Sequence, residues 1–316
     1  MDNYSGIKVL LIGTGAIGSF YGGKLSQAGA AVSAVCRSDY NIVKEKGIRI
    51  KSINGDFDFK PDSVFKKASE YNDTADFLVV ATKVLPDIDV VSIIRDAVKP
   101  STSIVLLQNG INIEKEVTDA FPDNEIISAL AFVCVSRVEY GLIDHQDYGR
   151  VVIGSFPSGV SGKVKLLEEM FKASGTPVET ADDIISARWK KLLWNAPFNP
   201  VSVIGGGVST KEMLADPLTE SFIENIMKEV YALSVADGHP VDENLIKKNL
   251  EDTYKMVPYK TSMLLDFEAG RPMEVEAILG NAVRIADKYG VGVPYLKSIY
   301  ALLDLINRKN ISKNKE

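Results

Sequence analysis

Two groups of residues in this chain have the types and spacing to do chemistry, and the first lies almost at its start. Three glycines follow the apolar run 9–12 with the spacing G-x-G-x-x-G, and a helical stretch comes after them. Between a strand and a helix, the first glycine permits a sharp turn, the second lets the backbone approach a pyrophosphate, and the third packs the helix on the strand. The helix N-terminus also presents free N–H groups to phosphates. The motif predicts a dinucleotide site, the alternative being a glycine-rich turn without a ligand, and it comprises Gly13, Thr14, Gly15, Ala16, Ile17 and Gly18.

The second group is a polar stripe in the later half of the chain. Lys191, Asn195 and Asn199 follow one another at steps of four residues. On a helix each such step turns the side chain by about 40°, so the three residues share one face. Apolar residues flank the stripe, Trp194 and Phe198 among them, and polar groups in such surroundings cost free energy unless they are paired. The stripe is predicted to face a ligand or another buried polar group, the alternative being an exposed, solvated face.

A lysine is the candidate proton donor if a nicotinamide cofactor reduces a carbonyl at this stripe. Of the two histidines, His145 stands in a polar segment that predicts a solvated turn, and His239 precedes a proline in another turn. The Tyr-x-x-x-Lys pairs lie too close to the nucleotide-binding elements to act as a tyrosine acid with its lysine partner. Lys191 remains, because a partly desolvated ammonium can protonate a nascent alkoxide and stabilise its charge.

The elements that must position these groups follow the pattern of a parallel sheet. Ligands of open α/β sheets bind beyond the carboxyl ends of the strands. Lys83 and Asn109 follow two such ends, which favours a role at the ligand over a surface lysine and a turn-forming asparagine. Apolar runs predict the buried strands at 9–12, 31–36, 77–81 and 103–107.

The end of the second predicted strand bears on which dinucleotide binds. In NAD-binding domains this position carries an acid that bonds the ribose 2′-OH. Here Cys36 is followed by Arg37 and Ser38, with no carboxylate before Asp39. An arginine can pair with a 2′-phosphate and stack on adenine, so NADP is favoured over NAD. The alternative for Arg37 is a solvated loop cation.

Further elements extend the predicted sheet. Alternating residues around the tight-turn pair Asn54-Gly55 predict an inserted hairpin over 47–60. The β-branched stretch 126–156 predicts two or three strands. An amphipathic helix over 162–174 and a short strand over 178–180 follow.

The pattern changes to helices almost throughout from Asp182 onward. We therefore expect an α/β protein with two domains. The N-terminal domain, residues 1–181, is a Rossmann-type dinucleotide-binding domain, and residues 182–316 form an all-helical substrate-binding domain.

Composition and charge restrict the classes of function. The 316 residues are 46% hydrophobic and 25% charged, which suits globular domains with sizeable cores. A net charge of −6 gives no long-range attraction to nucleic acid or to an anionic membrane. No apolar stretch reaches membrane-spanning length, and the start of the sequence does not read as a signal peptide. With Cys36 and Cys134 as the only cysteines, no disulfide framework or thiolate metal site is expected, and a reducing cytoplasm fits best.

A last polar group comes late in the chain. The run from Arg271 to Glu276 predicts the opening of a helix, with Pro272 in a favoured early position. Glu274 and Glu276 are acidic residues near that start. Complementing the helix dipole would by itself explain both carboxylates.

Together these residues resemble the ketopantoate reductase (2-dehydropantoate 2-reductase) family across essentially the whole chain. Each motif alone is weak, and the spacing between the motifs is the specific signal. The matching pieces are Gly13-Thr-Gly-Ala-Ile-Gly18, Cys36-Arg37, Thr82-Lys83, Gln108-Asn109-Gly110, residues 189–200, Thr261-Ser262 and Met273-Glu274-Val-Glu276.

The resemblance implies NADPH-dependent reduction of 2-dehydropantoate to (R)-pantoate, a step toward pantothenate and coenzyme A, in a cleft between a Rossmann domain and a helical domain. The family's catalytic lysine falls on Lys191 and its assisting glutamate on Glu274. The positions that bind substrate, or orient the lysine and the nicotinamide, fall on Asn109, Asn195, Asn199 and Ser262. The groups that hold the cofactor fall on Arg37 and Lys83, with Asn109 and Glu274 beside them.

Two other functions stay open at this point. Reductases of other branched 2-oxo acids share the general pattern, so the motifs do not fix the substrate. A regulator that binds NADP without turnover would have a degraded catalytic set, yet Lys191, Asn195, Asn199 and Glu274 are all present. The expected partner is a small 2-oxo acid, with no nucleic acid or membrane, and a helical second domain can supply the face of a homodimer.

Overall fold

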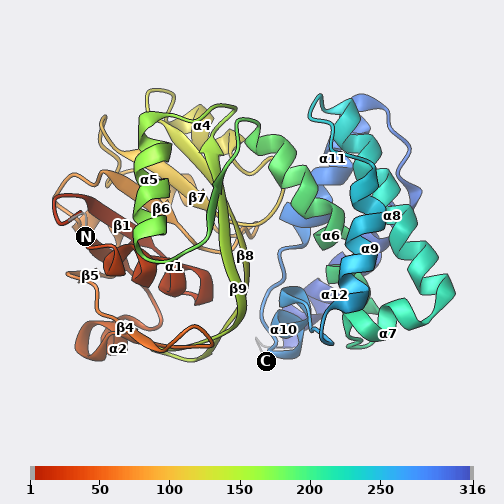
Figure 1. The fold of residues 1–316 in the computed structure, drawn as a ribbon, viewed down its shortest axis with the longest axis horizontal. Helices are drawn as coiled ribbons and strands as arrows, with labels where there is room; N and C mark the ends of the chain where they lie inside the picture. Colours follow the sequence, from red (N-terminus) through yellow and green to blue (C-terminus); the bar gives the residue numbers. More distant parts are fainter. Residues whose placement is uncertain (1–3, 314–316) are drawn as a thin grey trace. The chain divides into compact units, whose positions relative to one another are not determined.

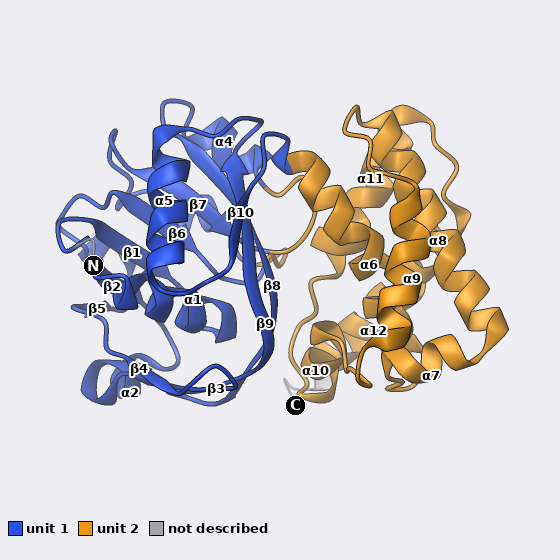
Figure 2. Cartoon of the chain, viewed as in Figure 1, with its two compact units in different colours: residues 1–83, 88–108, 114–184 blue, residues 84–87, 109–113, 185–316 orange. Residues whose placement is uncertain are grey.

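The computed structural model describes residues 4–313, and the chain divides into two compact units. Unit 1 comprises residues 1–83, 88–108 and 114–184, and unit 2 comprises residues 84–87, 109–113 and 185–316 (Figure 2). Two short segments that follow strands of unit 1 along the chain therefore belong to unit 2. The predicted site residues Lys83 and Asn109 stand where the chain passes from unit 1 to unit 2: Lys83 is the last residue before the first segment, and Asn109 is the first residue of the second.

Unit 1 is built on one mixed sheet, which in the described residues has ten strands. Its order is β4-β3-β9-β8-β7-β6-β1-β2-β5, with β10 paired to β9 (Figure 2). The strands are β1 (Lys8–Ile12), β2 (Ala31–Val35), β3 (Ile48–Ser52), β4 (Phe57–Phe59), β5 (Val64–Phe65), β6 (Phe77–Val80), β7 (Ser103–Leu107), β8 (Ile126–Glu139), β9 (Leu142–Ser155) and β10 (Val178–Thr180).

The central strands are buried on both faces, which explains why they are continuous apolar runs. In β1, Val9 and Leu11 join a cluster with residues of α1 and α5, while the alternating Leu10 is also fully buried. Helices α1 and α5 lie over one face of the sheet (Figure 1). The helices of this unit are α1 (Ala16–Gln27), α2 (Tyr40–Lys46), η1 (Ala68–Glu70), α3 (Val90–Ile94), α4 (Lys115–Ala120) and α5 (Gly162–Ala173).

The four predicted parallel strands are confirmed as β1, β2, β6 and β7. Their register pairs Ile12 with both Val35 and Val80, and Val80 with Leu106. Because the strands are parallel and in this register, their carboxyl ends lie along one edge of the sheet. The glycine turn, the Arg37 segment and the ends of β6 and β7 share this edge.

The predicted hairpin and the later strands are also confirmed. Strands β3 and β4 are antiparallel, with Ile48 opposite Phe59 and Ile50 opposite Phe57. Strand β3 runs parallel to β9, so the hairpin extends the main sheet at one end. The stretch 126–156 forms the long antiparallel pair β8 and β9, and α5 and β10 follow as predicted.

The interpretation of His145 as a solvated residue is wrong. His145 lies within β9, is 1% exposed and packs on Phe20 of α1, with 4.4 Å between ring centroids. Its Nε2 lies 3.1 Å from the carbonyl of Asp147 and 3.2 Å from that of Tyr148. Carbonyls only accept, so Nε2 carries the proton and Nδ1 accepts from the Ser52 hydroxyl at 2.8 Å. Burial lowers the pKa of His145, and the neutral ring joins β9 to α1 and β3.

The regular elements of unit 2 are all helical in the described residues. Helix α6 continues through Pro197 and Pro200 and contributes Trp189, Leu193 and Phe198 to the core of the unit. The helices are α6 (Ile184–Ile204, which begins at the unit boundary), α7 (Thr210–Ala215), α8 (Pro217–Ala236), α9 (Asn244–Lys255), α10 (Ser262–Glu268), η2 (Glu276–Gly280), α11 (Asn281–Tyr289) and α12 (Pro294–Lys313).

The predicted helix start at Arg271 is wrong. Residues 271–274 form no regular structure, and the helical backbone begins at Val275. The Met273 N–H donates to Asn307 Oδ1 of α12 at 3.0 Å, so a tertiary contact holds this segment away from the helical conformation. Pro272 therefore precedes the helix and does not lie in its first turn.

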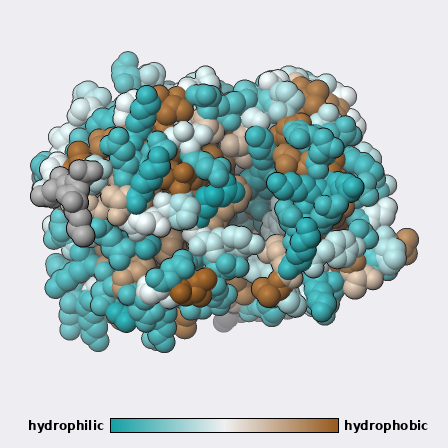
Figure 3. Space-filling view, in the orientation of Figure 1, coloured by the Kyte–Doolittle hydropathy of each residue, from teal (hydrophilic) through white to brown (hydrophobic). Residues whose placement is uncertain are grey.

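The view in Figure 3 shows a largely hydrophilic surface on which hydrophobic residues are scattered. Among residues 4–313, no helix combines the length and the apolar character that crossing a membrane requires. The same residues contain no cluster of three or more His, Cys, Asp or Glu side chains suited to a metal ion.

Candidate active site

The glycine-rich turn joins β1 to α1 at the common strand edge. Gly13 has a φ of +97°, a conformation that glycine adopts without strain. Its N–H donates to the Val35 carbonyl at 2.9 Å. A Cβ on Gly18 would lie 2.1 Å from the Gly13 carbonyl oxygen and 3.1 Å from Ala81 Cβ. Helix α1 therefore packs so closely on the ends of β1 and β6 that only glycine fits at position 18.

The outer side of this turn is open. Gly15 precedes the first residue of α1, and a Cβ built on it meets nothing within 4 Å. Among the described residues no side chain caps the helix at this position. A long helix with an open, uncapped N-terminus presents N–H donors to an anion. The residues 13–18 thus fit the pyrophosphate of a dinucleotide.

Charged residues surround the end of β2. Arg37 is exposed, whereas Asp39 is 5% exposed and accepts a hydrogen bond from the Thr14 hydroxyl at 2.7 Å. Arg137 of β8 lies 3.9 Å from the same carboxylate. Asp39 therefore supports the glycine turn from inside. Burial and the charge of Asp39 raise the pKa of Cys36 to about 11, so that thiol stays neutral.

The ends of β6 and β7 are tied to each other. Gln108 follows β7, is 8% exposed and donates from Nε2 to the Thr82 carbonyl at 2.8 Å. Lys83 is half-buried directly after Thr82. The chain then enters unit 2 at Val84 after the first of these ends and at Asn109 after the second.

Three of the predicted residues meet in unit 2 through hydrogen bonds. The Lys191 ammonium donates to Asn109 Oδ1 at 2.7 Å, and Asn109 Nδ2 donates to Glu274 Oε2 at 3.4 Å. The other Glu274 oxygen accepts the Val84 N–H at 3.0 Å. The charges fix the amide orientation, because the reverse arrangement would turn the amide donors toward the ammonium. Asn109 therefore links the Lys191 cation to the Glu274 anion. Lys191 is 82 positions from Asn109 in the sequence, and Glu274 is 165 positions from it.

Helix α6 carries the polar stripe. Lys191 and Asn195 are half-buried and Asn199 is 2% exposed, while the neighbouring Lys190 is exposed. The alternative of an exposed, solvated face thus describes Lys190 and not the stripe. Asn195 and Asn199 lie one and two turns beyond Lys191, outside the hydrogen bonds that join Lys191 to Asn109 and Glu274.

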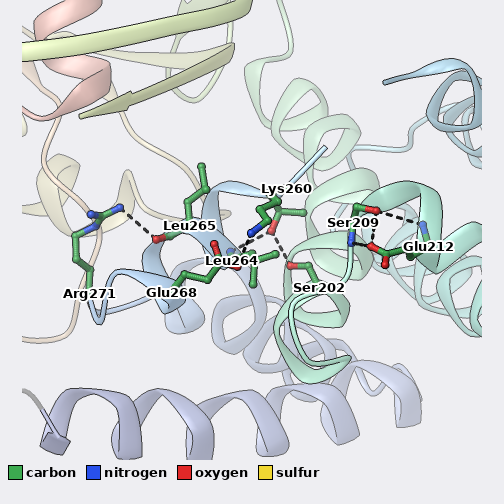
Figure 4. A network of polar contacts seen from close by, with 9 residues as sticks. Ser202, Ser209, Glu212, Lys260, Leu264, Leu265, Glu268 and Arg271 are labelled. Atoms are coloured by element: carbon green, nitrogen blue, oxygen red, sulfur yellow. Dashed lines mark hydrogen bonds and ion pairs between the residues drawn. The ribbon is translucent and has the colours of Figure 1, made fainter. Parts of the chain in front are cut away.

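Ser262 is the exposed first residue of α10 and is tied to the stripe indirectly, through a network of polar contacts that includes Ser202 and Leu264 (Figure 4). The Ser202 hydroxyl donates to the Asn199 carbonyl at 2.7 Å, so the Thr261 hydroxyl donates to Ser202 Oγ, also at 2.7 Å. Thr261 Oγ1 in turn accepts the Leu264 N–H at 3.2 Å and caps α10. These bonds fix Ser262 relative to Asn199 within unit 2.

Family models match most of this chain. Residues 9–158 match the model "Ketopantoate reductase PanE/ApbA", and residues 183–307 match "Ketopantoate reductase PanE/ApbA C terminal". This chain belongs to the ketopantoate reductase family. The resemblance predicted from the spacing of the motifs is confirmed, and the chain is a member of a family of oxidoreductases.

Relatives of this ketopantoate reductase family member cover nearly its whole length. A 2-dehydropantoate 2-reductase from Nostoc sp. is 34% identical over 313 residues, 96% of each chain. The crystal structure of 2-dehydropantoate 2-reductase from Methylococcus capsulatus is 50% identical, with a TM-score of 0.91 over 96% of this chain and 98% of that one. D-mandelate dehydrogenase, solved with NADH and anilino(oxo)acetate, shares the fold at 22% identity, with a TM-score of 0.88 over 96% of this chain and 99% of that one.

Two residues of the site of this family member were not predicted from the sequence. Val84 acts through its backbone N–H, which leaves no mark in the residue type. Arg188 is 2% exposed and donates from Nη1 to the Gly110 carbonyl at 3.0 Å. A signal for Arg188 existed, because it stands three residues before Lys191 and so lies on nearly the same helix face.

Proposed function

We propose that this chain catalyses the NADPH-dependent reduction of 2-dehydropantoate to (R)-pantoate, a step toward pantothenate and coenzyme A. The observation that carries the proposal is the hydrogen-bonded series Lys191–Asn109–Glu274, whose central residue stands two positions after the end of β7 in the chain. The 50% identity to the Methylococcus capsulatus enzyme supports this substrate. We assign dinucleotide binding to residues 1–181 and substrate binding to residues 182–316.

The dinucleotide would be held by residues of the common strand edge. The turn 13–18 would bind the pyrophosphate, Arg37 the 2′-phosphate, and Lys83 the phosphates and ribose. Asn109 follows β7 along the chain, and Glu274 bonds to Asn109 and to Val84, which follows β6. These bonds support a role for Asn109 and Glu274 next to the nicotinamide. When bound, the reduced dinucleotide supplies the hydride.

Lys191 is the proposed general acid. Its ammonium donates a proton from Nζ to the carbonyl oxygen of the substrate as negative charge develops there. Asn109 Oδ1 holds the ammonium at 2.7 Å, and Glu274 holds the other end of the Asn109 amide. The lysine is thereby kept in one orientation before the substrate arrives, which lowers the cost of reaching the reactive geometry.

The stripe and the start of α10 would bind the rest of the substrate. Asn195 and Asn199 offer amide groups, and Ser262 offers an exposed hydroxyl at a helix N-terminus. Amide N–H groups and a hydroxyl suit the carboxylate and the hydroxyl of a hydroxylated 2-oxo acid.

The test measures the rate of NADPH oxidation with a panel of 2-oxo acids that differ in side-chain shape, 2-dehydropantoate among them. The proposal expects the highest kcat/KM for 2-dehydropantoate. Bound NADPH without turnover of any 2-oxo acid would instead indicate a regulatory protein and would contradict the proposal.

A second candidate is the reduction of another branched or aromatic 2-oxo acid. Two observations favour it: D-mandelate dehydrogenase shares the fold, and Trp194 stacks on Phe198 beside the stripe, 4.8 Å between centroids. Phe198 is fully buried, so only the half-buried Trp194 offers surface to a substrate. A higher kcat/KM for an aryl 2-oxo acid in the same panel would favour this candidate.

Arg37→Ala tests the assignment of the 2′-phosphate. Arg37 is exposed after β2, so the change should leave the fold intact and remove a charged partner of that phosphate. We expect KM for NADPH to rise about tenfold or more, whereas KM for NADH should change less than about twofold. Steady-state kinetics with the two cofactors measure this, and equal effects on both would contradict the assignment.

A further inference from the structure

The segment that carries Asn109 is held by one irregular turn of unit 2, the π-helical turn η2 (Glu276–Gly280). The Asn281 N–H donates to the Glu276 carbonyl, five residues back, instead of to the Ala277 carbonyl as in an α-helix. The Ala277 carbonyl thereby loses its α-helical donor. It accepts the Ile111 N–H instead, at 3.1 Å.

The same turn binds the other backbone groups of this segment. Asn281 Nδ2 donates to the Ile111 carbonyl at 2.7 Å, so both polar groups of Ile111 bond to the η2–α11 junction. Ile111 is 1% exposed, and buried backbone groups are costly to leave unbonded. The junction is thus the partner on which the backbone of this segment depends.

Gly110 lets the two segments approach this closely. It has a φ of +110°, and a Cβ on it would lie 2.7 Å from both the Cβ and the carbonyl oxygen of Ala277. The Gly110 carbonyl accepts from Arg188 of α6, the helix that also carries Lys191. Residues 110 and 111 are therefore clamped between α6 and η2, and Asn109 directly precedes them.

The junction is itself supported. Asn281 Oδ1 accepts from Arg284 at 2.7 Å, and Arg284 also pairs with Glu276 at 2.8 Å. The Glu276 carboxylate accepts from the Tyr300 hydroxyl of α12 as well. Glu274, the anion of the proposed site, stands two residues before η2, and its carbonyl accepts the Ile278 N–H at 3.2 Å.

We infer that the η2–α11 junction is the positioning element of the lysine site, and that Asn281 is a positioning residue that acts on Lys191 through Asn109. This inference rests on the proposed role of Lys191 as proton donor. The π-helical turn frees the Ala277 carbonyl and orients the Asn281 amide, so that both groups bind Ile111. Asn281 itself touches neither Lys191 nor Glu274 through these bonds.

The test compares Asn281→Ala with Asn281→Asp. Alanine removes both side-chain bonds, whereas aspartate keeps an acceptor for Arg284 and loses only the donor to Ile111. We expect both variants to lower kcat about 10-fold to 100-fold, with KM for NADPH within about twofold of wild type because the glycine turn is untouched. Wild-type kcat in a folded Asn281→Asp variant would overturn the inference.

A double-mutant cycle with Asn109→Ala separates positioning from a general structural role. If Asn281 acts through Asn109, adding Asn281→Ala to Asn109→Ala should lower kcat by less than about twofold further. If the double variant instead loses kcat by the product of the two single-variant factors, the two residues act independently and the inference is contradicted. Should Asn281→Ala not fold, Arg284→Ala replaces it, because this side chain is 56% exposed and supports only Asn281 and Glu276 in the bonds above. The expected result is then a smaller fall in kcat with an unchanged KM for NADPH, and an unchanged kcat would count against the inference.

The Lys191→Ala variant separates a failure of the proposed function from a failure of the positioning role alone. If Lys191→Ala retains activity, the proposed function fails at its proton donor. If Lys191→Ala is inactive and both Asn281 variants turn over normally, only the positioning role fails.

Discussion

We expect Lys191→Ala to lower kcat by about 10²-fold to 10⁴-fold, the range that a positioned general acid contributes. The ammonium is the only group of the Lys191–Asn109–Glu274 series that can give a proton at neutral pH, because an amide and a carboxylate cannot. NADPH should still bind with nearly wild-type affinity, since the glycine turn and Arg37 belong to the other unit. Stopped-flow kinetics and a fluorescence titration with NADPH measure the two quantities.

Lys190→Ala is the matched control, because Lys190 is adjacent on the same helix but exposed. Its kcat should stay within about twofold of wild type, as surface substitutions rarely perturb a site. Lys191→Arg adds a second comparison, since a guanidinium keeps the charge and donors toward Asn109 but does not release a proton at neutral pH. Turnover near wild type in Lys191→Ala or Lys191→Arg would remove the lysine from the acid role.

Gly15→Ala and Gly18→Ala should fail in different ways, although both change the same motif. At Gly18 a Cβ would lie 2.1 Å from the backbone oxygen of Gly13, which cannot move aside without breaking the turn. We expect Gly18→Ala to lower the free energy of unfolding by about 3 kcal/mol or more, the upper range for overpacked sites. Cofactor binding should be lost with the geometry of the turn.

At Gly15 a Cβ meets nothing within 4 Å, and the backbone, with φ −67° and ψ −174°, suits alanine. Gly15→Ala should therefore unfold at the wild-type temperature and still bind NADPH at least about tenfold more weakly, because its methyl group occupies the path of the pyrophosphate. Thermal unfolding and NADPH titration on both variants give the comparison. Wild-type affinity in Gly15→Ala would show that no phosphate passes over this residue.

The local parts of the fold follow from the sequence because their causes are local. The buried strands appear as unbroken apolar runs, and Asn54-Gly55 predicts the hairpin β3–β4. The glycine turn combines a strand, three glycines and a helix within a few residues. Likewise the spacing of Lys191, Asn195 and Asn199 depends only on the helical repeat.

Tertiary contacts override the local signals of the sequence at two places. The polar neighbours of His145 indicate a turn, but the long β8–β9 pairing carries the chain through it and places the ring against Phe20. Pro272 suits a helix start, but the bond between Met273 and Asn307 holds the segment outside the helix. In both places the competing partner lies far away in the sequence, where no pattern reveals it.

The sequence by itself therefore determined the two kinds of structure, the dinucleotide turn and the identity of the candidate lysine, because helical and strand periodicity and glycine sterics act over neighbouring residues. Only the tertiary structure decided that Asn109 joins Lys191 to Glu274, and that the π-helical turn at Glu276–Gly280 holds the segment of Asn109. These hydrogen bonds connect residues from three separate parts of the chain. Their geometry depends on how whole helices pack, and packing is a property of the folded chain.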